Sequence, residues 1–159
     1  MPYIDLLSAD RIVMLVEPDP RDAVLDAAAR LLSGGTPMAT QQIASGLRAR
    51  ERLASTGIGH GVAIPHCRSN AFVAPRAAFL RLTAPIDFAA RDGRPVDLVF
   101  AMCVPEDLEQ QHLRTMAELA ERFSDAGFRD ALREADDIAT MRGVLLAPQA
   151  SDPWRIASA

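Results

Sequence analysis

The stretch between residues 55 and 68 restricts the backbone more than any other part of this chain. Three glycines occupy alternate positions in it, namely Gly57, Gly59 and Gly61. Glycine adopts backbone conformations that other residues avoid, and it allows a ligand or a partner to approach closely. A short apolar run at 62–64 follows, and Pro65 ends it by fixing its own backbone. The pattern predicts a glycine-rich loop, then a short buried strand, and then His66 at the strand end, where open α/β sheets usually place chemistry.

An arginine interrupts the apolar face of a helix predicted just before this stretch. Thr36 is a suitable N-cap and is followed by proline, so we predict a helix over residues 37–53. Ile43 and Leu47 lie on its apolar face, and the same spacing continues to Arg50. Because a buried or half-buried arginine needs an anionic partner, Arg50 is a candidate for binding an anion.

A histidine lies on the apolar face of a second predicted helix. The run 96–104 is the strongest strand in the sequence, and Pro105 opens a long predicted helix after it. Acidic residues in the first turn suit the dipole of that helix. His112 stands four residues after Leu108 and four before Met116, within the apolar stripe.

Together, His66, Arg50 and His112 fit the requirements of a phosphohistidine site. Taken singly, a histidine on an apolar face is more often a hydrogen-bonded core residue, and an arginine there can extend its charge to solvent. Neutral imidazole, however, is nucleophilic near pH 7 because its unperturbed pKa is about 6.5. Phosphoryl transfer needs positioning and charge neutralisation, and the planar fork of arginine holds two phosphate oxygens. A second histidine can orient the first or donate a hydrogen bond to the phosphoryl group.

The remaining patterns predict a single α/β domain with a central mixed β-sheet flanked by helices. Short connections between several strands indicate that part of the sheet is antiparallel. We expect the domain to cover residues 1–147 and a mobile C-terminal tail to cover 148–159. The other predicted segments are a strand at 12–16, a helix capped by Asp19, opened by Pro20 and ended by Gly34, a strand at 77–82, an irregular stretch at 85–88, a short helix at 128–132 and a last helix through 138–145.

Length and composition limit the possible classes of function. A chain of 159 residues can bury a core of its own, and 49% apolar residues suit an ordinary globule. The net charge of −4 argues against a nucleic-acid binder, which normally carries a basic patch. No apolar run is long enough for a transmembrane helix, and the N-terminus lacks the features of a signal peptide. We therefore expect a cytoplasmic protein whose two cysteines, Cys67 and Cys103, are both reduced.

Residues 55–66 read Ser-Thr-Gly-Ile-Gly-His-Gly-Val-Ala-Ile-Pro-His, an ordered motif of high specificity. This segment resembles the active-site motif of the enzyme IIA domains of the phosphotransferase system, in the fructose/mannitol class. It is most similar to the nitrogen-related regulatory branch of that class. The other segments that resemble the family are Arg50-Glu51, His112-Leu113, 85–88 and 92–100. The resemblance therefore extends over roughly residues 3–145.

The resemblance implies a phosphoryl carrier that uses no cofactor. In the family the last histidine of the motif, here His66, accepts phosphate through Nε2 from a phosphohistidine of HPr or of its nitrogen-branch relative. Arg50 and His112 would then shape the phosphate pocket. Backbone N–H groups near glycines can also cradle an anion, so we expect a loop that contacts phosphate or the partner protein. Its residues are Ser55, Thr56, Gly57, Gly59 and Gly61.

Several alternatives stay open beside this interpretation. Sugar-specific members of the family pass the phosphoryl group to an enzyme IIB, whereas nitrogen-branch members bind regulatory targets according to their phosphorylation state. We expect a freestanding chain without a fused enzyme IIB domain, which favours the regulatory branch. A binding module without phosphoryl chemistry would use the glycines only as a turn.

Two further alternatives concern metal binding and cysteine chemistry. A zinc site would recruit His60, His66, Cys67 and His112, but no pair has the spacing of a zinc finger and we expect no metal. Cys67, directly after His66, is either a small packing residue or a thiol that makes transfer sensitive to oxidation.

Overall fold

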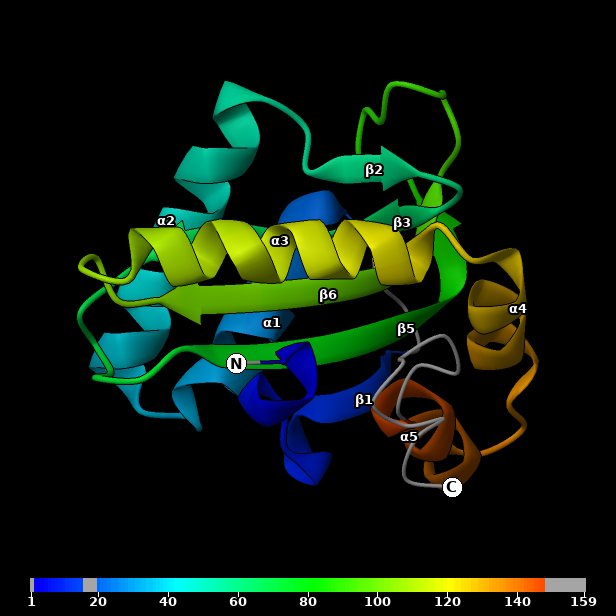
Figure 1. Ribbon diagram of the computed structural model, residues 1–159. Helices are drawn as coiled ribbons and strands as arrows, with labels where there is room; N and C mark the ends of the chain where they lie inside the picture. Colours follow the sequence, from blue (N-terminus) through cyan, green and yellow to red (C-terminus); the bar gives the residue numbers. More distant parts are fainter. Residues whose placement is uncertain (1, 16–19, 148–159) are drawn as a thin grey trace.

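The structure is a computed structural model, and it describes residues 2–15 and 20–147 (Figure 1). It confirms the predicted fold class, a single α/β domain in which helices flank a mixed, open β-sheet. The strands are β1 (Ile12–Leu15), β2 (Gly57–Gly59), β3 (Val62–Ala63), β4 (His66–Arg68), β5 (Arg76–Ile86) and β6 (Val96–Val104). The helices are α1 (Arg21–Ser33), α2 (Pro37–Leu53), α3 (Glu109–Phe123), α4 (Ala126–Glu134) and α5 (Ile138–Leu146), with short 3-10 helices η1 (Tyr3–Leu6) and η2 (Ala9–Arg11) before β1.

The strand β6 is the centre of the sheet. β5 pairs antiparallel with one edge of β6, and both β3 and β4 pair parallel with the other edge. β1 continues the sheet parallel to β5, and β2 continues it antiparallel to β3, which gives the order β1-β5-β6-β3-β2. Because β3 and β4 follow each other along one edge, they act as a single strand interrupted at Ile64 and Pro65.

Helices cover both faces of this sheet. Alternate residues of β6, from Leu98 to Val104, pack with α3, α4 and α5. The residues between them, from Val99 to Cys103, pack with α1 and α2 on the opposite face. Figure 1 shows α3 crossing the near face of β6, with α1 and α2 behind the sheet. Burial on both faces explains why β6 is an almost continuous apolar run in the sequence.

The end of α1 and the start of α2 follow the predicted capping signals. α1 ends at Gly34, whose φ of +70° favours glycine. α2 spans residues 37–53 with Thr36 as its N-cap, as predicted. Pro20 is the N-cap of α1 rather than its first helical residue, and the predicted cap Asp19 lies outside the described residues.

Strand β5 is longer than the sequence predicted. It extends past the expected end at Leu82 to Ile86, so the irregular stretch predicted from Pro85 is wrong for its first two residues. The register shifts after Arg81, and pairing resumes between Ile86 and Val96. A proline is tolerated at such an irregularity because its missing N–H is not required by the ladder.

Helix α3 begins at Glu109, four residues later than the start predicted at Pro105. A turn precedes it, in which the Leu108 N–H donates to the Pro105 carbonyl at 3.2 Å. The Leu108 carbonyl then accepts the N–H of His112 at 3.0 Å, so His112 lies at the first turn of the helix. This end of α3 follows directly from the end of β6, which brings His112 to the edge of the sheet.

The C-terminal helices agree with the predicted order of elements. α4 is longer at both ends than the predicted 128–132, and α5 covers the predicted last helix. The tail predicted at 148–159 lies outside the described residues, as does the last residue of the first predicted strand, Val16. Across the described ranges, no helix combines the length and apolar character that crossing a bilayer requires.

We predict that Phe123→Ala lowers the free energy of unfolding by about 3–5 kcal/mol. The buried Phe123 ring lies 5.2–6.3 Å from the rings of three other phenylalanines, on β5, β6 and α4. Truncation therefore leaves a cavity where α3, α4 and the sheet meet. Urea unfolding followed by circular dichroism measures the loss. Val73→Ala, at an exposed position, is the control and should change the value by less than about 0.5 kcal/mol. Equal effects of the two substitutions would contradict the prediction.

Candidate functional site

His66, Arg50 and His112 line one cavity of about 450 Å³. Each residue comes from a different element: the first residue of β4, the last turn of α2 and the first turn of α3. The other lining residues are Gly46, Ala49, Leu53, Cys67 and Arg68. No carboxylate is among these lining residues, so the cavity offers cationic, neutral and apolar groups only.

The interruption between β3 and β4 brings His66 to this cavity. Pro65 cannot donate a backbone hydrogen bond, but its carbonyl accepts the N–H of Met102 at 2.9 Å. β4 then resumes parallel pairing, with His66 opposite Met102 in the register. Because side chains alternate along a strand, His66 and Arg68 share one face of β4 and Cys67 occupies the other.

A backbone hydrogen bond fixes the tautomer of His66. The Nδ1 atom of its ring lies 2.9 Å from the carbonyl oxygen of Ile64. A carbonyl oxygen only accepts hydrogen bonds, so Nδ1 carries the proton and donates. Nε2 of the neutral ring is therefore left with its lone pair, as a nucleophile requires.

A chain of hydrogen bonds connects this tautomer to a buried carboxylate on α2. The Glu51 side chain accepts the Thr56 backbone N–H at 3.0 Å and the Thr56 hydroxyl at 2.6 Å. The Thr56 carbonyl accepts the Ile64 N–H at 3.0 Å, and the Ile64 carbonyl accepts the ring N–H of His66. Both carboxylate oxygens are satisfied, as a buried charge requires. Glu51 thus holds the peptide that orients His66.

The half-buried Arg50 forms a hydrogen bond at the end of its own helix. Its Nη1 donates to the Ala54 carbonyl at the C-terminal end of α2, at 2.8 Å. Among the described residues, no carboxylate forms an ion pair with Arg50. The predicted anionic partner is therefore not supplied by this part of the chain, and the charge of Arg50 remains beside the cavity.

The ring of His112 is buried and neutral. Its centroid lies 5.1 Å from that of His66, with the two planes inclined at 47°. Its Nδ1 atom is buried and has no hydrogen-bond partner among the described residues. Burial is the main cause that lowers the pKa of His112 from the ordinary 6.5 to about 4, and the neighbouring His66 and Arg68 contribute to the same shift.

Burial also lowers the pKa of His66. The hydrogen bond to Ile64 and the carboxylate of Glu51 oppose this effect, while the positive charge of Arg50 adds to it. Both imidazole rings at the cavity are therefore neutral near pH 7. The site combines one free nitrogen nucleophile with one guanidinium that has no carboxylate partner among the described residues.

The predicted phosphate and partner loop forms a hairpin beside this cavity. The glycines belong to β2 and to the tight turn into β3, where Gly59, His60 and Gly61 all have positive φ. Ser55, Gly57 and Gly59 line a separate cavity of about 600 Å³, and Thr56 is buried against Glu51. None of the five predicted loop residues, Ser55, Thr56, Gly57, Gly59 and Gly61, lines the cavity of His66. A direct role for them toward phosphate or a partner stays a prediction.

The hairpin is also tied to α4. Arg133 donates to the His60 carbonyl at 2.5 Å and forms an ion pair with Asp97 of β6. Gly61 has a φ of +78°, which favours glycine, and a Cβ atom there would also come within 2.5 Å of the Arg133 guanidinium. The need for glycine at that position is structural.

Sequence reasoning missed several residues of the cavity wall. Gly46, Ala49 and Leu53 lie on the same side of α2 as Arg50, at spacings of three and four residues. That spacing, continued from Arg50, would have identified Gly46 and Leu53, and counted back from Leu53 it would have identified Ala49. Arg68 follows His66 by two residues on β4, and recognising β4 as a strand would have placed it on the same face.

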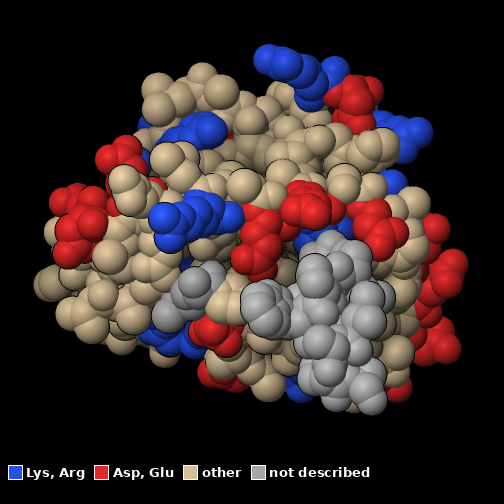
Figure 2. All heavy atoms as spheres, viewed as in Figure 1, with Lys and Arg blue, Asp and Glu red and all other residues tan. Residues whose placement is uncertain are grey.

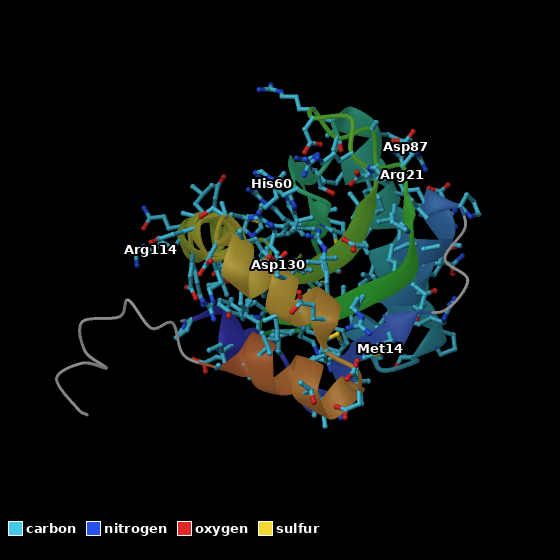
Figure 3. All side chains as sticks on the ribbon, turned by 90° about the vertical axis from the view of Figure 1, so that its right-hand side faces the viewer. Met14, Arg21, His60, Asp87, Arg114 and Asp130 are labelled. Carbon is cyan, nitrogen blue, oxygen red and sulfur yellow. The ribbon has the colours of Figure 1, made fainter. Side chains whose placement is uncertain are left out.

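The zinc alternative finds no support in the geometry. Within residues 2–15 and 20–147, no three His, Cys, Asp or Glu side chains gather closely enough to hold a metal ion. His60 lies on the exposed β2–β3 turn, where its N–H donates to Asp92 at 2.8 Å (Figure 3).

Comparison with known families assigns the chain. Residues 5–147 match the family described as "Phosphoenolpyruvate-dependent sugar phosphotransferase system, EIIA 2". The chain belongs to this family. It is therefore an enzyme IIA component of the phosphotransferase system, as its motif indicated, and the two histidines and the arginine of the cavity lie within the matched range.

Relatives of this enzyme IIA carry two kinds of name. A "Nitrogen regulatory protein" of Pseudomonas aeruginosa is 41% identical over 131 residues, covering 82% of this chain and 85% of that protein. Another nitrogen regulatory protein, of Bradyrhizobium diazoefficiens, is 32% identical, and the match covers 95% of this chain and 99% of that protein. A "PTS system fructose-specific EIIA component" of Haloferax volcanii is 34% identical, and the match covers 80% of this chain and 70% of that protein.

Solved structures agree with the fold. The nitrogen regulatory protein IIA-Ntr of Neisseria meningitidis superposes with a TM-score of 0.82 at 33% identity, covering 90% of this chain and 98% of that one. The IIA mannitol protein of Escherichia coli superposes with a TM-score of 0.69 at 18% identity, covering 87% of this chain and 97% of that one. The second comparison shows the fold alone.

We predict that His112 titrates near pH 4 and His66 below 6.5 when histidine ring signals are followed by NMR. In the unfolded chain both groups bind a proton near pH 6.5. Since the folded pKa values are lower, the free energy of unfolding is highest above pH 6.5 and falls as the pH is lowered toward 4.

The variant His112→Gln is the control for this pH dependence. It should lose part of the fall in stability between pH 6.5 and 4, measured by urea unfolding at each pH. A His112 midpoint at or above 6.5 would show that its burial does not disfavour the charged ring.

Proposed function

We propose that this enzyme IIA carries a phosphoryl group on Nε2 of His66. The observation that carries the proposal is the hydrogen bond from Nδ1 to the Ile64 carbonyl, which leaves Nε2 as the unprotonated nitrogen in the cavity that Arg50 also lines. Membership of a phosphotransferase family supports the same reaction. His66 stays neutral near pH 7, so no base is needed to activate it.

The transfer takes place in one displacement. The lone pair of Nε2 attacks the phosphorus of a donor phosphohistidine, a new N–P bond forms, and the donor N–P bond breaks with its electron pair returning to the donor imidazole. The Nδ1 proton stays on His66 and remains hydrogen bonded to Ile64. Arg50 balances the charge on the moving phosphoryl oxygens, and His112 donates a hydrogen bond to them from its neutral ring.

The donor in this proposal is a protein of the HPr type. This enzyme IIA then acts in the nitrogen branch, in the cytoplasm. Two relatives of high coverage are named nitrogen regulatory proteins, which supports a regulatory role. In that role, targets would bind according to the phosphorylation state of His66.

The similarity to a fructose-specific EIIA component supports the second candidate, a sugar-specific enzyme IIA. That candidate passes the phosphoryl group on to an enzyme IIB. One solved structure with the same fold is a complex of the Escherichia coli mannitol enzyme IIA with phosphorylated enzyme IIB, so this fold can dock on such a partner.

The surface around the cavity suits a protein partner. Leu53 of α2, at the cavity wall, is 84% exposed, and Leu113, next to His112, is 62% exposed. Large exposed apolar side chains beside a reactive group are typical of a docking surface. Figure 2 shows acidic and basic side chains interspersed over the face that α3 covers, and every basic side chain is arginine because the chain contains no lysine. Such mixed charge favours a protein over a nucleic acid.

We predict that phosphoenolpyruvate, enzyme I and an HPr-type donor add one acid-labile phosphoryl group to the wild type and none to His66→Ala, as measured by intact mass. The nitrogen-branch and the sugar-branch donor pairs are tested in parallel. Failure with both pairs would refute the carrier function. Transfer onward to a purified enzyme IIB would favour the sugar-specific candidate over the regulatory one.

We predict that Arg50→Ala slows transfer about 10²-fold while the protein stays folded. Arg52→Ala is the matched control, because Arg52 lies on the same turn of α2 but lines a different cavity, between α1 and α2. The rate is measured by quenched-flow mass spectrometry, and folding by thermal unfolding. Equal rates for Arg50→Ala and Arg52→Ala would remove Arg50 from the site.

We predict that Leu53→Asp and Leu113→Asp each raise the KM for the phosphorylated donor protein about tenfold. A charge placed on the apolar rim weakens docking without changing His66. Met38→Asp is the control, because Met38 is also exposed but lies roughly 22 Å from Leu53 along α2. A KM that is unchanged in both rim variants would exclude this surface as the docking site.

A further inference from the structure

Two buried cysteines lie opposite each other, one of them directly after His66. Cys67 of β4 and Cys103 of β6 are paired residues in the parallel register, and both side chains lie on the α1–α2 face of the sheet. Both are free and buried. Directly paired residues on neighbouring strands have the short Cα separation that a disulfide needs, and these two side chains lie on the same face of the sheet.

The surroundings make Cys103 the more reactive thiol of the pair. Arg76 lies opposite it in the β5–β6 register. The neighbouring Cys67 is the main cause that lowers the pKa of Cys103, and the positive charge of Arg76 adds to the effect. The neighbouring Cys103 and burial raise the pKa of Cys67. Cys103 is therefore the thiol that ionises more readily, and Cys67 is the partner that can condense with it.

The cavity of His66 connects this pair to the surface at Cys67. Cys67 is only 6% exposed, but it contributes to the cavity wall beside Arg50 and His66. Gly46 of α2 lies on its other side, where a Cβ atom would come within 2.9 Å of the Cys67 Cβ. Helix α2 therefore packs directly on the cysteine with no side chain between them.

We propose that Cys67 and Cys103 are a modification site, which a hydroperoxide converts into a reversible intramolecular disulfide. The Cys103 thiolate attacks one peroxide oxygen, the O–O bond breaks, and the products are a sulfenic acid and, for hydrogen peroxide, hydroxide. The Cys67 sulfur then attacks the sulfenic sulfur, forms the S–S bond and releases water, which takes up the thiol proton. Two thiols lose two electrons, and the peroxide is reduced to two waters.

The disulfide also slows phosphoryl transfer, an effect that rests on the function proposed for His66. Replacing the thiol contact by a covalent bond draws the Cys67 and Cys103 sulfurs together and shifts β4 at the residue that follows His66. The same shift changes the contact with Gly46, one helical turn before Arg50. A displacement of about 1 Å at a reacting group reduces the rate on the order of 10- to 100-fold.

The test treats the full-length reduced protein with hydrogen peroxide, blocks remaining thiols with N-ethylmaleimide, and maps tryptic peptides by mass spectrometry. We expect a linked pair of peptides containing Cys67 and Cys103, lost again after dithiothreitol. Cys67→Ser treated in the presence of dimedone should carry the dimedone adduct on Cys103. Two alkylated thiols in peroxide-treated wild type would overturn the proposal. Thermal unfolding confirms that each variant is folded.

Phosphorylation is measured on the same samples. We expect the oxidised wild type to be slower by about 10-fold or more and to recover with dithiothreitol. Cys103→Ala changes a residue outside the cavity, and this variant should be phosphorylated at the same rate with and without peroxide. An unchanged rate in fully oxidised wild type would overturn the effect on transfer. If reduced wild type accepts no phosphate while the linked peptides are found, the carrier function fails and the modification site stands.

Discussion

The burial of β6 is the constraint on which the rest of the structure depends. Both faces of this strand are covered by helices, and both of its edges are paired. Its backbone groups must therefore be satisfied by neighbouring strands, and one edge is satisfied by two short strands, β3 and β4. The interruption between them at Pro65 is tolerated because the Pro65 carbonyl still accepts the Met102 N–H. His66 is thus held at a sheet that is rigid because it is buried.

The second requirement of the site is a neutral ring in one tautomer, and Glu51 supplies it indirectly. A buried carboxylate is costly unless its oxygens are hydrogen bonded, and Thr56 satisfies both. This anchors the peptide whose Ile64 carbonyl accepts the proton of His66. The charge of Glu51 also opposes that of Arg50 at the ring. Removing Glu51 would therefore disturb both the direction and the electrostatics of the nucleophile.

Periodicity predicted the parts of this arrangement that lie on long elements, and it failed where the structure depends on pairing. Arg50 and His112 were found because each falls on an apolar helix face, and both line the cavity. The anionic partner of Arg50 stays a prediction, because among the described residues its side-chain hydrogen bond goes to a carbonyl at the helix end. A three-residue strand such as β4 carries too little pattern to be recognised, so Arg68 was missed. The role of the glycines toward phosphate or a partner stays a prediction, because the need for a tight turn and close packing has the same sequence signal as ligand contact.

The charge balance of the cavity explains how the proposed carrier would present two distinguishable states. Before transfer the cavity holds two neutral imidazoles and the charge of Arg50, surrounded by the exposed Leu53 and Leu113. A phosphoryl group on Nε2 brings about two negative charges to that centre and leaves the ring cationic, which strengthens the hydrogen bond from Nδ1 to Ile64. The same anion favours protonation of His112, whose charged form is disfavoured before transfer. The apolar rim stays constant while the charge at its centre reverses, so a partner that docks on the rim can discriminate the two states by electrostatics alone.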